Sequence, residues 1–229
     1  MNRKLELEII FENNDFLVLN KPAGIIVHPT KYEQKKTLIQ ALLKYLPSIS
    51  KVGEPSRPGI VHRLDKDVSG LMVVAKNNYF YNYLVSEFKK RKVKKKYIAL
   101  VYGHPKEKKG IVETSIGWSK KGKIVAREIA IKLKKKARTE YKVKKEYKDF
   151  TLLEVSPLSG RTHQIRVHMA YLGTPIVGDK IYKFKNHPLL LNRLFLHCAY
   201  IGFWQPDGKF REFYSPLPSE LETFLKKMK

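Results

Sequence analysis

Residues 62–70 read HRLDKDVSG and place five charged or titratable side chains between two apolar runs, residues 59–61 and 71–75. Asp65 and Asp67 are two residues apart, so in extended backbone they would share a face. Two facing carboxylates are typical of acid–base work on a glycosidic bond. In the alternative interpretation, one carboxylate is functional while its neighbour caps a turn or pairs with Lys66. Either way, charges held between buried segments indicate a candidate reaction centre.

A second group of polar residues lies at 158–169, LSGRTHQIRVHM. Read as a strand, it projects Gln164, Arg166 and His168 from one face and Ile165 and Val167 from the other. An exposed strand face beside solvent would show the same pattern. We expect Arg166 to pair with Asp65, because a guanidinium holds a carboxylate ionised and oriented.

The elements that position these groups follow from apolar periodicity and turn residues. Thr37 caps a predicted helix over 38–46, Asn78 caps one that reaches 88, and Ser219 with Glu222 forms a capping box for a last helix. Residues 48–59 are predicted as a loop. Strands are predicted at 9–11, 16–19, 71–75, 96–102, 111–116, 138–144, 151–156 and 162–169. Most connections are too short for parallel crossovers, so the pattern predicts an α+β fold, with a mixed, largely antiparallel sheet flanked by helices and loops.

The chain is strongly basic, with 46 Lys and Arg residues against 21 Asp and Glu residues and a net charge of +25. Such an excess favours a polyanionic partner, because neutralising phosphates releases counterions. A general lysine bias or a solubility trait is the alternative. The charge is clustered at 89–96, 132–138 and 142–145. We assign contacts with a phosphate backbone to the following residues: Lys89, Lys90, Arg91, Lys92, Lys94, Lys95, Lys134, Lys135 and Lys136.

Several classes of protein are disfavoured. Cys198 is the only cysteine, so no disulfide within the chain and no thiolate zinc site can form. The sequence has no HExxH pattern, no P-loop and no run of about 18 apolar residues, and its N-terminus lacks the apolar core of a signal peptide. We expect a cytoplasmic protein, a monomer without membrane attachment, that uses no metal.

The motifs, taken together, resemble those of one enzyme family. HRLDKDVSGLMVVAK (62–76) is similar to the signature of RluA-type RNA pseudouridine synthases. FENNDFLVLNKPAGIIVHP (11–29), KKKYIALVYG (94–103), SGRTHQIRVHMAYLGTPIVGDKIY (159–182) and LHCAYIGF (196–203) resemble further motifs of that family, in the same order. The resemblance covers some nine-tenths of the chain. It implies the synthase catalytic fold with a central cleft, as a single domain over 1–229 without the S4 domain that many relatives carry.

The resemblance also implies a reaction and roles for residues. Uridine within tRNA or rRNA would be isomerised to pseudouridine without any cofactor, with the target base flipped out of its stack. Asp65 matches the catalytic carboxylate, Tyr97 the tyrosine that stacks on uracil, and Arg166 the partner of the carboxylate. The expected substrate-binding residues are Arg63, which would occupy the vacated space, His62, Lys21, Gln164 and Arg161.

Two other functions remain as alternatives. An RNA-binding or chaperone protein without catalysis would be expected to lack Asp65, Tyr97 or Arg166, and all three are present. A glycoside or nucleoside hydrolase using Asp65 and Asp67 would release a free base and leaves the charge unexplained. The sequence does not specify the RNA, the uridine, the number of sites, or the atom that Asp65 attacks.

Overall fold

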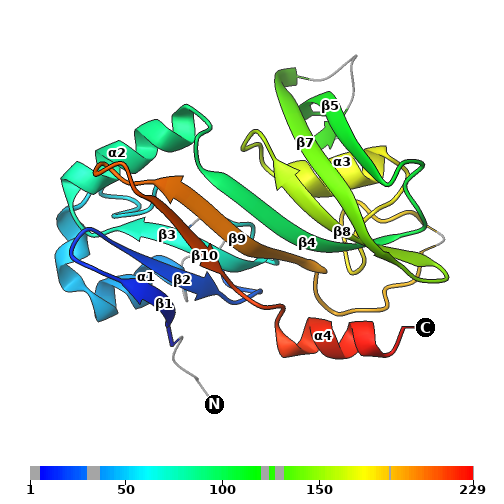
Figure 1. The fold of residues 1–229 in the computed structure, drawn as a ribbon, viewed down its shortest axis with the longest axis horizontal. Coiled ribbons are helices and arrows are strands. Elements are labelled where there is room, and N and C mark those ends of the chain that lie inside the picture. Colours follow the sequence, from blue (N-terminus) through cyan, green and yellow to red (C-terminus); the bar gives the residue numbers. More distant parts are fainter. Residues whose placement is uncertain (1–5, 30–36, 120–123, 127–131, 186, 229) are drawn as a thin grey trace. The chain divides into compact units, whose positions relative to one another are not determined.

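The structure is a computed structural model that describes residues 6–29, 37–119, 124–126, 132–185 and 187–228 (Figure 1). The chain forms two compact units. The first comprises Met1–Lys94 and Cys198–Ser215, and the second comprises Lys95–His197 and Pro216–Lys229. The single catalytic domain expected over 1–229 stays a prediction.

The first unit is built on five strands in the spatial order β1-β2-β3-β9-β10. They are β1 (Glu8–Glu12), β2 (Phe16–Lys21), β3 (Ser69–Ala75), β9 (Leu196–Trp204), whose first two residues belong to the second unit, and β10 (Phe210–Tyr214). The pairs β1–β2, β2–β3 and β9–β10 are antiparallel. Every residue of β3 is buried, which explains the unbroken apolar run at 71–75.

Two helices of the first unit begin at side-chain caps. α1 (Leu38–Tyr45) begins at Thr37, as predicted, which forms a capping box with Gln40. A 3-10 turn at Pro47–Lys51 follows and overlaps the start of the predicted loop at 48–59. α2 (Asn78–Lys89) is capped by Asn77, one residue earlier than predicted. Asn77 keeps extended backbone and accepts the N–H of Phe80 at 2.8 Å, whereas the Asn78 amide accepts the N–H of Gly53. Asn78 is thus engaged with the loop at Gly53, and Asn77 caps the helix instead.

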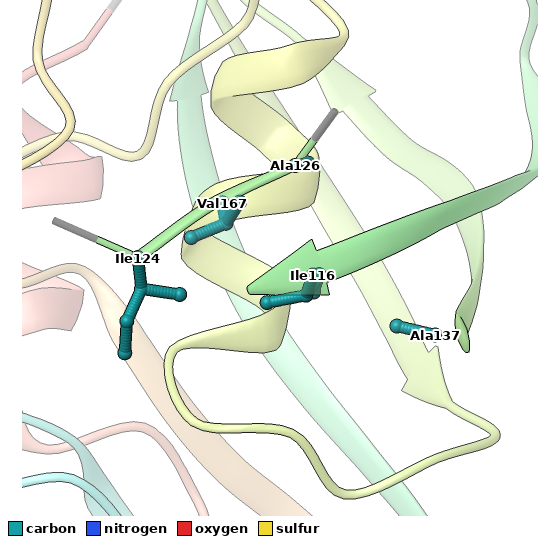
Figure 2. Packing of buried hydrophobic residues seen from close by; sticks show 5 residues of the cluster. All are labelled: Ile116, Ile124, Ala126, Ala137 and Val167. Atoms are coloured by element: carbon teal, nitrogen blue, oxygen red, sulfur yellow. The ribbon is translucent and has the colours of Figure 1, made fainter. Parts of the chain in front are cut away.

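The second unit contains an antiparallel run of strands in the order β4-β8-β7-β5-β6. Their bounds are β4 (Lys94–Tyr102), β5 (Lys109–Trp118), β6 (Ile124–Ala126), β7 (Lys132–Glu146) and β8 (Phe150–Pro157). α3 (Gln164–Tyr171) packs on β5 to β8. Figure 2 shows Val167 of α3 beside Ile116, Ile124, Ala126 and Ala137, which together form a buried apolar cluster. The α+β class and the largely antiparallel pairing are confirmed.

The predicted strand at 162–169 is wrong, because residues 164–171 form the helix α3. The alternating pattern misled because α3 is buried from Gln164 through Met169, and so it lacks the apolar stripe of a surface helix. His163, with a φ of 56°, precedes the helix, and Gly173, with a φ of 83°, follows it. A glycine just after the C-cap residue commonly ends a helix, so Gly173 was the feature of the sequence that could have indicated α3.

Other predictions need smaller corrections. α4 (Ser219–Lys226) forms as expected, but its N-cap is Pro218 and no side-chain cap is made, so the capping box of Ser219 and Glu222 is wrong. Strands β6, β9 and β10 were not predicted. β9 contains residues of LHCAYIGF, buried along nearly its whole length, which gives no alternation to recognise.

Candidate active site

Asp65 lies half-buried in the first unit, directly before a turn at residues 66–67. The N–H of Val68 donates to the Asp65 carbonyl at 3.2 Å and closes this turn. Because the backbone turns between Asp65 and Asp67, the extended geometry that would have put both carboxylates on one face is wrong. The geometric argument for a hydrolase pair therefore fails.

The segment before Asp65 is fixed on strand β3. Ile60 forms a bridge with Val74, and the His62 Nε2 accepts the N–H of Val73 at 3.0 Å. The His62 ring also stacks on Phe88, with ring centroids 4.7 Å apart. The Nε2 of His62 therefore anchors the segment 62–70 to the sheet, and the predicted binding of substrate by His62 stays a prediction.

Lys21 lies beneath the Asp65 turn and is completely buried. Its Nζ donates to the carbonyls of Pro22 and Ile25 at 2.8 Å and to that of Lys66 at 3.2 Å. The N–H of Gly24 donates to the same Lys66 carbonyl. A buried ammonium is tolerated when its donors are used in this way. Lys21 thus ties the turn at 21–25 to the residue that follows Asp65, and its observed contacts are those of a positioning residue.

Arg63 is exposed beside Asp65, and its NH1 lies 3.2 Å from the Nε2 of His28. Burial, followed by the charges of Arg63 and Arg57, lowers the pKa of His28. A neutral His28 is therefore favoured, with Nε2 free to accept from the guanidinium. His28 belongs to the quoted motif at 11–29, but no local pattern indicates its pairing with Arg63.

Arg166 lies in the second unit on α3 and is only 4% exposed. Its Nε and NH2 donate to the two carboxylate oxygens of Asp179 at 2.8 and 2.9 Å, and its guanidinium lies 5.2 Å from the ring centre of Tyr182. Burial raises the pKa of Asp179, but the hydrogen bonds and charge of Arg166, with the N–H groups of Ile181 and Tyr182, bring it below its ordinary value. Asp179 was not among the predicted site residues.

The pairing of Arg166 with Asp65 joins residues of the two units and stays a prediction. The strand argument that placed Arg166 on a polar face is overturned by the helix. The Asp179 carboxylate, which follows the buried residues Ile176 and Val177 within the quoted motif at 159–182, fixes the direction of the guanidinium.

Gln164 begins α3 and is 4% exposed. Its Nε2 donates to the Arg138 carbonyl and to Thr139 Oγ1, both at 2.9 Å. Its Oε1 accepts from Ser159 Oγ at 2.7 Å and from the Arg161 N–H at 3.0 Å. All of its amide hydrogen-bonding capacity is used inside the protein, so Gln164 connects α3 to β7. The prediction that it lies on the open face of a strand is wrong.

Tyr97 lies on β4 with 7% of its surface exposed. It is directly opposite Val155 of β8, which is opposite Tyr141 of β7. Cross-strand partners share a face, so Tyr97 lies on the same side as Tyr141 and Thr139. Because Gln164 of α3 donates to Thr139, this is also the face that α3 covers.

The remaining predicted residues lie at the surface or close to it. Arg161 is half-buried and donates from Nε to the Lys136 carbonyl at 3.2 Å. Lys89, Lys90, Arg91 and Lys92 are exposed where α2 ends, Lys94 and the half-buried Lys95 begin β4, and Lys134, Lys135 and Lys136 are exposed on β7.

A shallow hollow of about 430 Å³ lies on β5, β7 and β8. Its charged lining is mixed, with Lys109 and Lys142 beside Glu140 and Glu154, and no predicted catalytic residue takes part. Within the described ranges, no group of three or more His, Cys, Asp or Glu side chains could hold a metal ion. No helix in the part of the chain that the structure describes is long and apolar enough to span a membrane.

Comparison with known proteins places these residues in a family. The model of the RNA pseudouridylate synthase family matches residues 15–171. An uncharacterized RNA pseudouridine synthase of Chloroflexus aurantiacus is 42% identical over 210 residues, which are 91% of this chain and 65% of that protein. The ribosomal large subunit pseudouridine synthase D of Zymomonas mobilis is 37% identical over 231 residues, 97% of this chain and 73% of the relative.

A solved structure shows the same fold. Human RNA pseudouridylate synthase domain containing 1 is 27% identical and superposes with a TM-score of 0.79, covering 93% of this chain and 84% of the human chain. The matched residues include Asp65 and its turn, Tyr97 and α3. This chain therefore belongs to the RNA pseudouridylate synthase family.

Proposed function

We propose that this protein isomerises uridine to pseudouridine within RNA, with Asp65 as the catalytic carboxylate. The observation that carries the proposal is the Asp65 turn, within a chain of the synthase family. Asp65 is half-buried, Lys21 binds the carbonyl of the next residue, Lys66, and His62 binds the preceding segment to β3. Members of this family are isomerases, and the chain retains Tyr97 and Arg166 as well.

The reaction breaks the bond between ribose C1′ and uracil N1, turns the detached base, and joins C5 to C1′. The proton on C5 is lost and N1 gains one, so no atom of the nucleotide other than hydrogen is exchanged. Asp65 would act on the detaching nucleoside, while Tyr97, on the face of its sheet beside α3, would stack on the uracil. The neutral His28 would hold the Arg63 guanidinium, which fills the space left by the flipped base.

The fixed geometry of these groups is what a catalyst of this kind requires. Groups held in place before reaction lower the barrier because little reorganisation is needed. The Lys66 carbonyl, fixed by Lys21 and by the N–H of Gly24, restricts the turn directly after Asp65. Arg166 is restricted by two hydrogen bonds to Asp179. We propose that Arg166 donates to Asp65 as well when RNA is bound.

Large-subunit ribosomal RNA is the proposed first substrate. Relatives that cover nearly the whole chain are named ribosomal large subunit pseudouridine synthase D, among them those of Zymomonas mobilis and Nitrosomonas europaea. The net charge of +25 fits a heavily phosphorylated partner. Transfer RNA is the second pool to test.

The test measures tritium release from RNA labelled at uracil C5, with unmodified rRNA and tRNA as separate pools. The purified protein is compared with Asp65→Asn, which keeps the size of the side chain, and with Asp67→Asn as the matched control across the turn. We expect release from rRNA, a loss of about 10³-fold or more in Asp65→Asn, and little change in Asp67→Asn.

Three outcomes would contradict the proposal. Equal loss in both variants would remove the distinction between the two carboxylates. A free base among the products would indicate hydrolysis instead of isomerisation. RNA binding without release from either pool would favour the chaperone function.

A further inference from the structure

The tip of the β9–β10 hairpin carries an aromatic pair that the proposed reaction does not use. Trp204 and Phe210 are direct partners across the two strands, with ring centroids 5.1 Å apart and the ring planes inclined by 57°. Trp204 is 49% exposed although tryptophan is a residue that folding usually buries. About half of the surface of this residue is therefore exposed to a partner.

Hydrogen bonds hold the hairpin tip in place. The N–H of Gln205 donates to the Lys209 carbonyl at 2.8 Å, and the N–H of Gly208 donates to the Gln205 carbonyl at 3.0 Å. The hydroxyl of Tyr83 on α2 donates to the Trp204 carbonyl at 2.8 Å, so the hairpin is attached to α2, beside which it lies in Figure 1. A fixed aromatic surface binds a flat partner with little loss of conformational entropy.

Positive charge adjoins the pair. Lys94 Nζ lies 5.2 Å from the ring centre of Phe210, and Lys94 directly continues the basic run that begins with Lys89 at the end of α2. The nearby carboxylate of Asp207 is 3.5 Å from Lys209 and is thereby compensated. Aromatic rings interleaved with cations suit a partner that presents flat bases and phosphates at the same time.

We propose that Trp204 and Phe210 form a stacking site for an unpaired base of the RNA, with Lys94 placed at an adjacent phosphate. A base within a duplex has no free face, so the ligand is a single-stranded stretch of the RNA. The site is named the hairpin platform. It rests on the proposed function for the identity of the partner, but its chemistry requires no uridine and no isomerisation.

The two tryptophans of the chain make a direct measurement possible. Trp118 is 47% exposed, close to the value for Trp204, and lies on β5 of the second unit. In a Trp118→Phe background, Trp204 is the only tryptophan, and its fluorescence reports stacking. The probe is a 12-nucleotide oligoadenylate, which contains no uridine, and the control probe is an abasic ribose-phosphate oligomer of equal length and charge.

We expect saturable quenching by oligoadenylate and none by the abasic oligomer. Equal quenching by both, or binding by anisotropy without quenching, would overturn the platform. In the wild-type background, Trp204→Ala should weaken oligoadenylate binding about 5- to 150-fold, the range of one base–aromatic stack. The matched Trp118→Ala should leave it nearly unchanged, and an equal loss in both variants would again refute the site.

Trp204→Phe keeps an aromatic surface and should retain most of the affinity, which separates loss of stacking from loss of folding. If Trp204→Ala fails to fold, the fluorescence titration of the Trp118→Phe variant still tests whether a base stacks on Trp204. Tritium release distinguishes this inference from the proposed function. Quenching without release would leave the platform standing and remove the isomerase, while release without quenching would do the reverse.

Discussion

The two segments that carry the predicted chemistry differ in how their polar groups are used. In the first unit, the segment 62–70 leaves Arg63 and Lys66 exposed and Asp65 and Asp67 half-buried. In the second unit, α3 buries every residue from Gln164 through Met169, and the side chains of Gln164 and Arg166 are hydrogen-bonded inside the protein. One segment presents charge at the surface of its unit and the other uses it for packing.

The difference indicates where substitutions should affect activity and where they should affect folding. When one member of a buried polar pair is removed, the other stays buried without a partner. Its desolvation is then uncompensated, which lowers the free energy of unfolding. Replacing an exposed group changes the free energy of unfolding little. If such a group takes part in the reaction, its replacement should instead change the kinetics. The four predictions below are ordered by the expected change in the free energy of unfolding.

Asp179→Asn should have the largest effect on stability. It leaves the Arg166 guanidinium, which is 4% exposed, without its carboxylate. Breaking a buried pair in this way costs about 3–5 kcal/mol. Urea unfolding of the variant measures the loss, and Asp207→Asn, an exposed carboxylate paired with Lys209, is the control. If both variants lose the same small amount, α3 is not held by its buried pair.

His168 should make stability depend on pH. Burial lowers the pKa of its imidazole from 6.5 to about 4, and its Nε2 lies 3.3 Å from Thr114 Oγ1. The folded state therefore binds fewer protons than the unfolded state between these two values. The contribution of the neutral His168 to the free energy of unfolding is fully present above pH 6.5 and is lost as the pH falls towards 4. The loss is about 3 kcal/mol in all and about 2 kcal/mol between pH 7 and pH 5.

The measurement is urea unfolding at pH 7 and pH 5 for the wild type, His168→Gln and His104→Gln. His104 is exposed and is the matched histidine control. His168→Gln should remove most of the difference between the two pH values. An unchanged difference in His168→Gln would assign the acid sensitivity to other groups.

Gln164→Leu should cost about 1–3 kcal/mol, since it leaves the Arg138 carbonyl and the Ser159 hydroxyl without this partner inside the protein. Leucine fits a buried helix position by size, so the effect comes from hydrogen bonding. Thermal unfolding monitored by circular dichroism gives the change. A variant as stable as the wild type would show that the hydrogen bonds of Gln164 do not stabilise the fold.

Arg63→Gln should have the smallest effect on unfolding, about 0.5 kcal/mol or less, because the side chain is exposed. Its effect should appear instead in kcat/KM for RNA, with a loss of about 10-fold or more from a missing charge-assisted contact. Steady-state tritium release tests this. Wild-type kinetics in Arg63→Gln would end the proposal that it fills the space of the flipped base.

The sequence predicted much of the fold because most elements carry local signals. Thr37 caps α1 through its own side chain, and the run 71–75 is apolar because β3 is buried on both faces. The choice of Asp65 as the catalytic carboxylate came from the order of motifs and stays a proposal, whereas the family itself is shown. These features depend on neighbours within a few residues or on the pattern of the whole chain.

What the sequence alone determined was the α+β class, most strands, the basic character and the set of residues gathered at 62–70 and 159–182. Only the tertiary structure decided that α3 is a helix, that Gln164 and Arg166 bond to Thr139 and Asp179, and that Lys21 supports the Asp65 turn. The physical reason is burial. A polar residue in a sequence reads as exposed, and it becomes internal only when distant residues supply every hydrogen bond that water would have made.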